Sequence, residues 1–233
     1  MQDTRPTIVF DLDGTLVDSA PDLIDTLNVI LRAEGISPLA FETARPLIGH
    51  GVRVLLERSF ETIRRPCPPD DLERMFKAYL DHYSGRIAQL TRPFPGLEPA
   101  LDTLTARGCV LAVCTNKLEW LSRKLLDTLG LTSRFAAICG QDTFGMPKPD
   151  PEILRRTIVA AGGDPAFAVM VGDSVTDIRT AQAAQIPVVL TDFGYPDHIE
   201  AGLPPDRIIR HFDALPEAVF ALLAGARTPV LAR

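Results

Sequence analysis

Short runs of consecutive apolar residues, each bounded by turn residues, recur along the chain. They occupy positions 7–10, 109–114, 136–139, 168–171, 187–190 and 207–209. Runs of this length are typical of strands that are buried on both faces of a parallel sheet. Between the later runs, apolar residues follow helical spacing over 118–129, 152–161 and 177–184. This alternation of strands and helices predicts an α/β fold with a doubly wound parallel sheet.

The interval between the first two runs is too long for this alternation. A strand, a crossover helix and a second strand need only about 30 residues, whereas the first run ends at residue 10 and the second begins at 109. Within the interval, apolar residues follow helical spacing over 22–34, 41–47, 52–60 and 70–88. We therefore predict a Rossmann-like core of residues 1–17 and 96–233, with an inserted α-helical cap domain over 18–95. The turn-rich segment 91–96 fits a two-strand linker between them, and the crossover helix follows at 97–107.

Composition narrows the possible partners. The net charge is −6 without a basic run, which makes nucleic acid an improbable partner. No apolar run approaches the roughly 20 residues that span a bilayer, and the N-terminus has no signal-peptide pattern. The four cysteines form no close pair, and three of them lie in apolar runs, where they are interpreted as core filler. The unpaired cysteines favour a cytoplasmic protein. We expect a monomer or homodimer that acts on a small molecule.

The most informative residues are Asp11 and Asp13, which lie two positions apart at the end of the first run. Alternate residues of a strand point to the same side, so the two carboxylates are expected side by side. Such close like charges repel unless a cation or a proton neutralises them. We infer a bound metal and an acid–base pair. Gly14 permits the sharp turn that follows.

Polar residues also follow the other predicted strands. In open parallel sheets, ligands bind beyond the carboxyl ends of the strands, so these side chains are expected to converge on one crevice. They are Thr115, Asn116 and Lys117 after the second strand, Lys148 in the loop after the third, and Asp173, Ser174 and Asp177 after the fourth.

This combination suits phosphoryl transfer. An aspartate can attack phosphorus and form an aspartyl-phosphate, and Mg²⁺ prefers carboxylate and phosphate oxygens. Asp11 and Asp173 are expected to hold the ion, while a Thr hydroxyl and a Lys ammonium balance charge on the phosphoryl oxygens. Asp13 can protonate the leaving alkoxide and then take a proton from the attacking water.

Four segments resemble, in order, the motifs of the haloacid dehalogenase superfamily: Asp11-Leu12-Asp13-Gly14-Thr15, Cys114-Thr115-Asn116, Lys148-Pro149-Asp150-Pro151 and Gly172-Asp173-Ser174-Val175-Thr176-Asp177. The resemblance implies that Asp11 is the nucleophile and Asp13 the acid–base residue. Thr115, Asn116 and Lys148 would bind the phosphoryl group, and Lys148 would also steady the nucleophile. Asp173 and the Asp13 carbonyl would join Asp11 as metal ligands, with Ser174 and Asp177 in support.

Within the superfamily the chain is most similar to bacterial phosphoglycolate phosphatases, through segments 18–23, 48–51, 115–117 and 193–195. Pro147 departs from the pattern, because relatives often have a basic residue there. The resemblance implies Mg²⁺-dependent hydrolysis of a small phosphate monoester, with 2-phosphoglycolate favoured. Arg45, His50 and Arg53 are candidates for substrate binding, although a structural His50 and surface salt bridges for the two arginines are simpler interpretations.

Several alternatives remain open. A sugar phosphomutase, or a phosphatase of another small metabolite, would carry the same core motifs. A phospho-acceptor or scaffold without hydrolytic activity would also use an aspartate, a Thr and a Lys at strand ends. Thr115 or Asn116 could cap the following helix, whereas Asp150 followed by Pro151 is expected to begin the next one. Trp120 and the apolar positions of its helix are interpreted as core.

Overall fold

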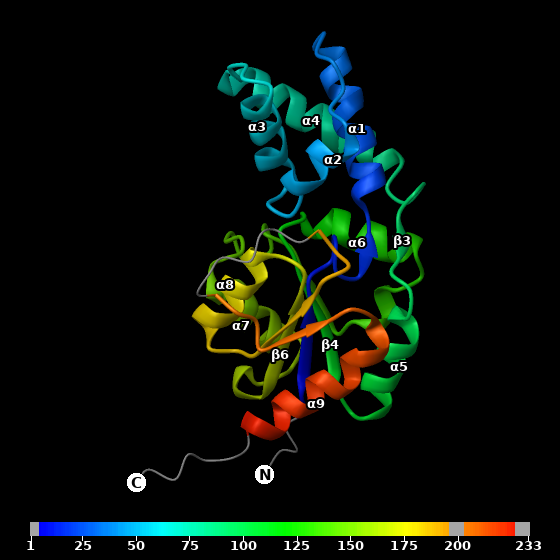
Figure 1. The fold of residues 1–233 in the computed structure, drawn as a ribbon, viewed down its shortest axis with the longest axis vertical. Coiled ribbons are helices and arrows are strands. Elements are labelled where there is room, and N and C mark those ends of the chain that lie inside the picture. The colour runs from blue at the N-terminus through cyan, green and yellow to red at the C-terminus, as the bar shows by residue number, and fades with distance from the viewer. Residues whose placement is uncertain (1–4, 196–202, 227–233) are drawn as a thin grey trace.

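The computed structural model describes residues 5–195 and 203–226, and its largest element is a six-stranded parallel sheet. The strands lie in the order β5-β4-β1-β6-β7-β8, and every neighbouring pair is parallel. Their bounds are β1 (Thr7–Phe10), β4 (Val110–Cys114), β5 (Ala137–Cys139), β6 (Ala168–Gly172), β7 (Val188–Thr191) and β8 (Arg207–Ile209). Helices cover both faces (Figure 1), so the predicted doubly wound α/β fold is confirmed.

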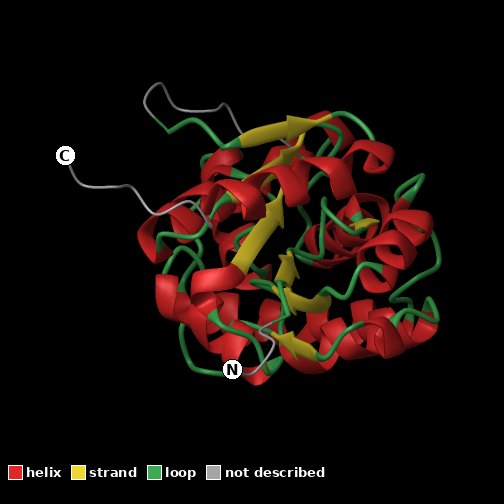
Figure 2. Cartoon of the chain, turned by 90° about the horizontal axis from the view of Figure 1, so that it is seen from below, coloured by secondary structure: helices red, strands yellow, loops and turns green. Residues whose placement is uncertain are grey.

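Alternation along the central strand explains the two layers of helices. Ile8 and Phe10 of β1 face one side, where they share a core with α5 (Leu97–Ala106), α6 (Glu119–Thr128) and α9 (Leu215–Ala226). Val9 faces the other side, where α7 (Pro151–Ala160) and α8 (Val175–Ala184) pack. Figure 2 shows the strands of this sheet running between helices. Both faces are apolar, which is why the strands read as uninterrupted apolar runs.

The segment between β1 and β4 is helical, as its spacing predicts. It contains α1 (Ala20–Ala33), α2 (Phe41–Ala44), a 3₁₀ turn (Arg45–Leu47), α3 (Val52–Thr62) and α4 (Pro69–Gly85). We call α1 to α4 the helical insertion; α4 packs against α1 and α3, and the group lies beyond one end of the sheet in Figure 1. Two short antiparallel strands, β2 (Val17–Asp18) and β3 (Arg92–Pro93), pair where the chain enters and leaves it.

Some local predictions need correction. Trp120 is 46% exposed and is not a core residue. Neither Thr115 nor Asn116 caps a helix, because α6 begins after Leu118 without a side-chain cap. The expected helix over 41–47 tightens into a 3₁₀ turn at Pro46, which has no amide hydrogen to donate. The start of α7 is confirmed: Asp150 accepts a hydrogen bond from the Glu152 amide, and Pro151 follows.

Within the described ranges, every helix is either too short or too polar to cross a bilayer.

Candidate active site

Three buried carboxylates meet at the carboxyl edge of the sheet. Asp11 follows β1, Asp173 follows β6, and Asp177 lies in the first turn of α8; one oxygen from each lies within 4.8 Å of the others. Because β1 and β6 are neighbours in register, with Phe10 opposite Val171, residues that follow them must lie side by side. The sheet topology therefore creates the concentration of negative charge.

Both carboxylate oxygens of Asp177 accept hydrogen bonds from neighbouring residues of the site. Its Oδ2 accepts hydrogen bonds from the amides of Asp173 and Ser174 and, at 2.7 Å, from the Ser174 hydroxyl. Ser174 in turn caps α8 by accepting the Asp177 amide, which completes a capping box. The Asp177 Oδ1 accepts from the Lys148 ammonium at 2.7 Å. With both oxygens engaged, Asp177 holds Asp173, Ser174 and Lys148 in place.

Lys148 is the cation that balances this cluster. Its side chain is 1% exposed, and Nζ lies 2.8 Å from Asp11 Oδ1 and 2.7 Å from Asp177 Oδ1. Burial alone would lower the pKa of Lys148, but the carboxylates of Asp11 and Asp177 outweigh burial and raise it. The ammonium therefore stays charged and stands beside the oxygen of Asp11.

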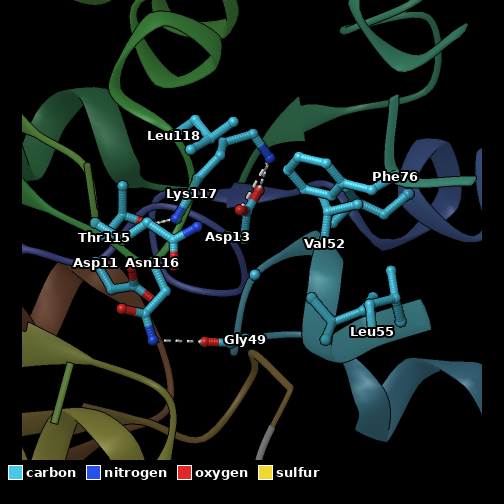
Figure 3. Close-up of a pocket in the computed structure, with 14 residues that line it drawn as sticks. Asp11, Asp13, Gly49, Val52, Leu55, Phe76, Thr115, Asn116, Lys117 and Leu118 are labelled. Carbon is cyan, nitrogen blue, oxygen red and sulfur yellow. Dashed lines mark hydrogen bonds and ion pairs between the residues drawn. The ribbon is translucent and has the colours of Figure 1, made fainter. Parts of the chain in front are cut away.

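Asn116 fixes the loop that carries Lys148. Its Oδ1 accepts the Lys148 amide at 2.7 Å, and its Nδ2 donates to the Lys148 carbonyl at 3.2 Å. Nδ2 also donates to the Gly49 carbonyl at 3.3 Å, which ties the loop to the helical insertion (Figure 3). The Asn116 side chain is thus a positioning group. Thr115 Oγ1 accepts the Lys117 amide at 3.2 Å, which leaves the Thr115 hydroxyl hydrogen for another acceptor.

The donor set fits a hard divalent cation. Asp11 Oδ1 is buried, and despite its closeness to Lys148 it accepts no well-aligned hydrogen bond from the described residues. Burial raises the pKa of Asp11 to about 6. Burial, followed by repulsion from Asp177 and Asp11, raises the pKa of Asp173 well above its usual value. Two carboxylates that are unfavourably charged without a counter-ion are the ligands that Mg²⁺ prefers.

The backbone closes tightly around Asp173. Its Oδ1 accepts from the Thr15 hydroxyl at 2.9 Å, and its Oδ2 from the Tyr195 amide at 2.7 Å. A Cβ placed on Gly14 would lie 2.2 Å from Asp173 Oδ2, and a Cβ on Gly194 would lie 2.2 Å from the Gly14 carbonyl oxygen. Both positions therefore need glycine, so that the backbone can approach the carboxylate.

Asp13 has different partners from Asp11. Its two oxygens each lie 2.9 Å from the Lys117 ammonium, and its Oδ1 also accepts from the Ser19 hydroxyl at 2.6 Å. Sequence reasoning had placed Lys117 at a strand end but gave it no role. It also missed Ser19, Thr15 and Tyr195 as partners of the site carboxylates. Thr15 lies in the motif that begins at Asp11, and Ser19 follows four residues later, whereas no local signal pairs Lys117 with Asp13 or Tyr195 with Asp173.

A pocket lies between the residues at the strand ends and the helical insertion (Figure 3). Its polar lining comes from the strand ends: Asp11, Asp13, Thr115, Asn116, Lys117 and Gln141. Its apolar lining comes from Leu118 and from Leu23, Ile48, Val52, Leu55 and Phe76 of the insertion, with Gly49 and Gly51 between them. Figure 3 shows Val52, Leu55 and Phe76 across the pocket from the 115–117 segment. The nucleophile and acid–base residues implied by the motifs therefore share one cavity.

The three candidate substrate residues of the insertion, Arg45, His50 and Arg53, are not among the residues that line the pocket. Arg45 donates to the Gly194 carbonyl at 2.5 Å and lies over the Tyr195 ring, so it connects the insertion to the loop beside Asp173. Arg53 pairs with Glu73 at 2.7 Å. His50 is half-buried between two glycines of the pocket but is not itself one of the lining residues. The described partners of Arg45 and Arg53 are thus groups other than the site carboxylates.

Known proteins share this architecture. The family model for haloacid dehalogenase-like hydrolases matches residues 8–191. A phosphoglycolate phosphatase of Mesorhizobium japonicum is 50% identical over 212 residues, which cover 91% of this chain and 93% of the relative. Another, from Agrobacterium fabrum, is 42% identical over 220 residues, 94% of each chain. A solved structure, described as a predicted phosphoglycolate phosphatase from Haemophilus somnus, has a TM-score of 0.84 at 27% identity and covers 93% of this chain and 99% of its own. The resemblance carried by the four motifs is thus confirmed, and the chain belongs to the haloacid dehalogenase-like hydrolases.

Proposed function

We propose that this protein is a Mg²⁺-dependent phosphatase that hydrolyses a small phosphate monoester through an aspartyl-phosphate on Asp11, with 2-phosphoglycolate as the favoured substrate. The observation that carries the proposal is the convergence of Asp11, Asp13 and Thr115 on one pocket, with Lys148 and Asp173 against Asp11. The relatives named phosphoglycolate phosphatase support both the phosphatase activity and the substrate.

In the first half-reaction an Asp11 oxygen attacks phosphorus, and the bond from phosphorus to the alcohol oxygen breaks. Asp13 gives its proton to that oxygen as it leaves. Lys148 holds the Asp11 carboxylate and balances charge on the phosphoryl oxygens, to which the Thr115 hydroxyl donates. A Mg²⁺ ion held by Asp11, Asp173 and the Asp13 carbonyl would supply further positive charge beside the phosphoryl group.

In the second half-reaction a water molecule attacks the phosphorus of the aspartyl-phosphate. Asp13 takes the proton of that water, the bond from phosphorus to Asp11 breaks, and inorganic phosphate leaves. Asp177 and Ser174 keep Lys148 and Asp173 in place throughout. The chain thus returns to its starting protonation state after one turnover.

The proposal includes the domain organisation. A core of residues 1–17 and 96–233 would provide the chemistry, and residues 18–95 would act as a cap that excludes water while the aspartyl-phosphate forms. The pairing of β2 with β3 supports this division, because these strands lie where the chain enters and leaves the insertion. The four cysteines are unpaired and three are buried, which favours a reducing compartment and hence the cytoplasm.

Replacing the nucleophile tests the mechanism. We expect Asp11→Asn to lower kcat for 2-phosphoglycolate by at least about 10⁴-fold, because the amide cannot attack phosphorus. Asp127→Asn on the exposed side of α6 is the matched control and should retain wild-type kcat. Phosphate release is followed with and without a chelator, and added Mg²⁺ should restore the chelated wild type. An Asp11→Asn enzyme with more than a few per cent of wild-type activity would exclude Asp11 as the nucleophile.

The same assay separates the alternatives. A phosphomutase would return the phosphoryl group to a sugar phosphate and release little inorganic phosphate. A phospho-acceptor or scaffold would keep a stable phosphate on Asp11 and show no sustained release. We expect stoichiometric inorganic phosphate for every ester consumed, over many turnovers.

A further inference from the structure

In the part of the chain that the structure describes, positive charge in the pocket is confined to one place, and this limits where an anionic group of the substrate can bind. Of the described residues that line the pocket, Lys117 is the single cation. Lys148 is not among the lining residues and is held by Asp11 and Asp177. Arg53, the nearest arginine in sequence to the lining residues Val52 and Leu55, pairs with Glu73 instead. A negatively charged part of a substrate other than its phosphoryl group can therefore be recognised at Lys117.

Lys117 is held firmly where the leaving group must lie. Its side chain is 4% exposed, and its ammonium lies 2.9 Å from both oxygens of Asp13 and 4.7 Å from the centroid of the Tyr83 ring in α4. An ammonium has three donor hydrogens. Asp13 accounts for two of them in the described part of the chain, so a third remains for an incoming acceptor.

The proposed reaction places the leaving oxygen within hydrogen-bond reach of Asp13, and Asp13 contacts Lys117 directly. The Lys117 ammonium is thus next to the alcohol portion of the ester. In the phosphate ester of a 2-hydroxy acid, the carboxylate carbon is two bonds from the bridging oxygen. A carboxylate at that position reaches Lys117, whereas a charge farther along a chain would extend toward the apolar insertion.

The opposite wall argues against a polyol substrate. Leu23, Ile48, Val52, Leu55 and Phe76 offer no side-chain hydrogen-bond partner. Sugar hydroxyls facing that wall would lose water without gaining partners, which is unfavourable. A short acid can bind Lys117 through its carboxylate, and the apolar wall then serves only to exclude water.

Building on the proposed function, we propose that Lys117 is a specificity-determining residue that binds the substrate carboxylate. The carboxylate takes the free donor of Lys117, while Asp13 and the ring of Tyr83 fix the ammonium in place.

The test compares 2-phosphoglycolate with its neutral carboxamide, 2-phosphoglycolamide, for wild type and Lys117→Met. We expect wild type to prefer the acid in kcat/KM by roughly 10- to 150-fold, the range for a hydrogen bond to a charged group. Lys117→Met should bring the ratio close to one, and Lys117→Arg should keep part of the preference. Lys124→Met, an exposed lysine on α6, is the matched control and should keep the wild-type ratio.

The outcomes separate this inference from the phosphatase proposal. If Lys117→Met is folded by circular dichroism and keeps the wild-type ratio, or if wild type shows no preference, Lys117 does not bind the carboxylate. Release of phosphate from p-nitrophenyl phosphate tests phosphatase activity independently of any carboxylate. If no ester is hydrolysed, the phosphatase proposal fails, and calorimetric binding of the acid and the amide to wild type and Lys117→Met decides the role of Lys117 by the same ratio.

Discussion

At the scale of single residues, the site depends on carboxylates that the fold buries together. Asp11, Asp173 and Asp177 lie close to one another, and burial raises the pKa values of Asp11 and Asp173. A raised pKa means that the charged form of each carboxyl group is less favourable than it would be in water, and a bound divalent cation would offset this cost. The affinity for a metal and the affinity for protons are therefore linked.

This linkage gives a pH dependence with a definite sign. The pKa of Asp11 is raised to about 6, so below that pH a proton occupies the ligand oxygen and competes with Mg²⁺. We expect Mg²⁺ affinity to fall as the pH is lowered from about 7.5 to 5.5, and binding near pH 6 to release protons. Titration calorimetry in buffers of different ionisation enthalpy measures both. Equal affinity at the two pH values, without proton release, would contradict the assignment of Asp11 as a ligand.

How far residue roles can be predicted depends on where the partner lies in the sequence. Asp11, Asp13, Lys148 and Asp173 lie in short motifs that a single sequence reveals. The ion pair of Asp13 with Lys117 could not be predicted in this way, because it depends on the parallel pairing of β1 with β4, with Phe10 opposite Val113. The same holds for the Tyr195 amide on Asp173, which joins the ends of two further strands.

At the scale of elements, the strands of the large sheet were predicted to within one residue at each end, because most of their positions are apolar and all except the exposed positions of the edge strand β8 are buried. The predictions of the helices were less accurate than those of the strands. In α6 the buried positions include Leu121 and Leu125, four apart, and Trp120 lies about a quarter-turn from that stripe. The helix α9 was not predicted, since most of its positions are apolar and show little periodic contrast.

The loops that follow the strands are more constrained than their sequences suggest. We expect Gly194→Ala to weaken Mg²⁺ binding and to lower kcat/KM at least roughly 10-fold, because its Cβ would overlap the Gly14 carbonyl and displace the Tyr195 amide from Asp173. The same steric overlap should also reduce the free energy of unfolding by about 1–3 kcal/mol. Kinetics and urea denaturation measure the two effects.

A second glycine serves as the control. Gly85, at the end of α4, has no atom within 4 Å of a Cβ built on it. Gly85→Ala should keep wild-type kinetics and raise stability by up to about 1 kcal/mol, since alanine favours the helix. If both variants behaved alike, the close approach at Gly194 would have no functional importance.

At the scale of the whole molecule, Asp22 joins the two chain segments that connect the helical insertion to the sheet. It lies in α1, is 5% exposed, and accepts hydrogen bonds from the amides of Leu90 and Thr91 and from the Thr91 hydroxyl. Asp22→Ala leaves buried donors without an acceptor and should reduce the free energy of unfolding by about 1–3 kcal/mol.

Its neighbour Asp25 provides the comparison on the same helix. Asp25 is exposed, with an ion pair to Arg86 at 3.8 Å, so Asp25→Ala should change stability by no more than about 0.5 kcal/mol. Denaturant unfolding of both variants measures the difference. Equal losses would show that the Asp22 hydrogen bonds do not stabilise the junction.

The larger hydrophobic cluster runs without interruption from the sheet into the insertion, through Leu12, Leu16, Val17 and Ala20. A chimera that carries the insertion of a relative on this sheet could not simply be joined at positions 17 and 18, because side chains on both sides of that boundary pack in the same core. The chimera would have to import the donor's residues at 12–20 as well, or leave a void at the junction. The exchange of selectivity between members of such a family is thus limited by shared packing as much as by the chemistry of the pocket.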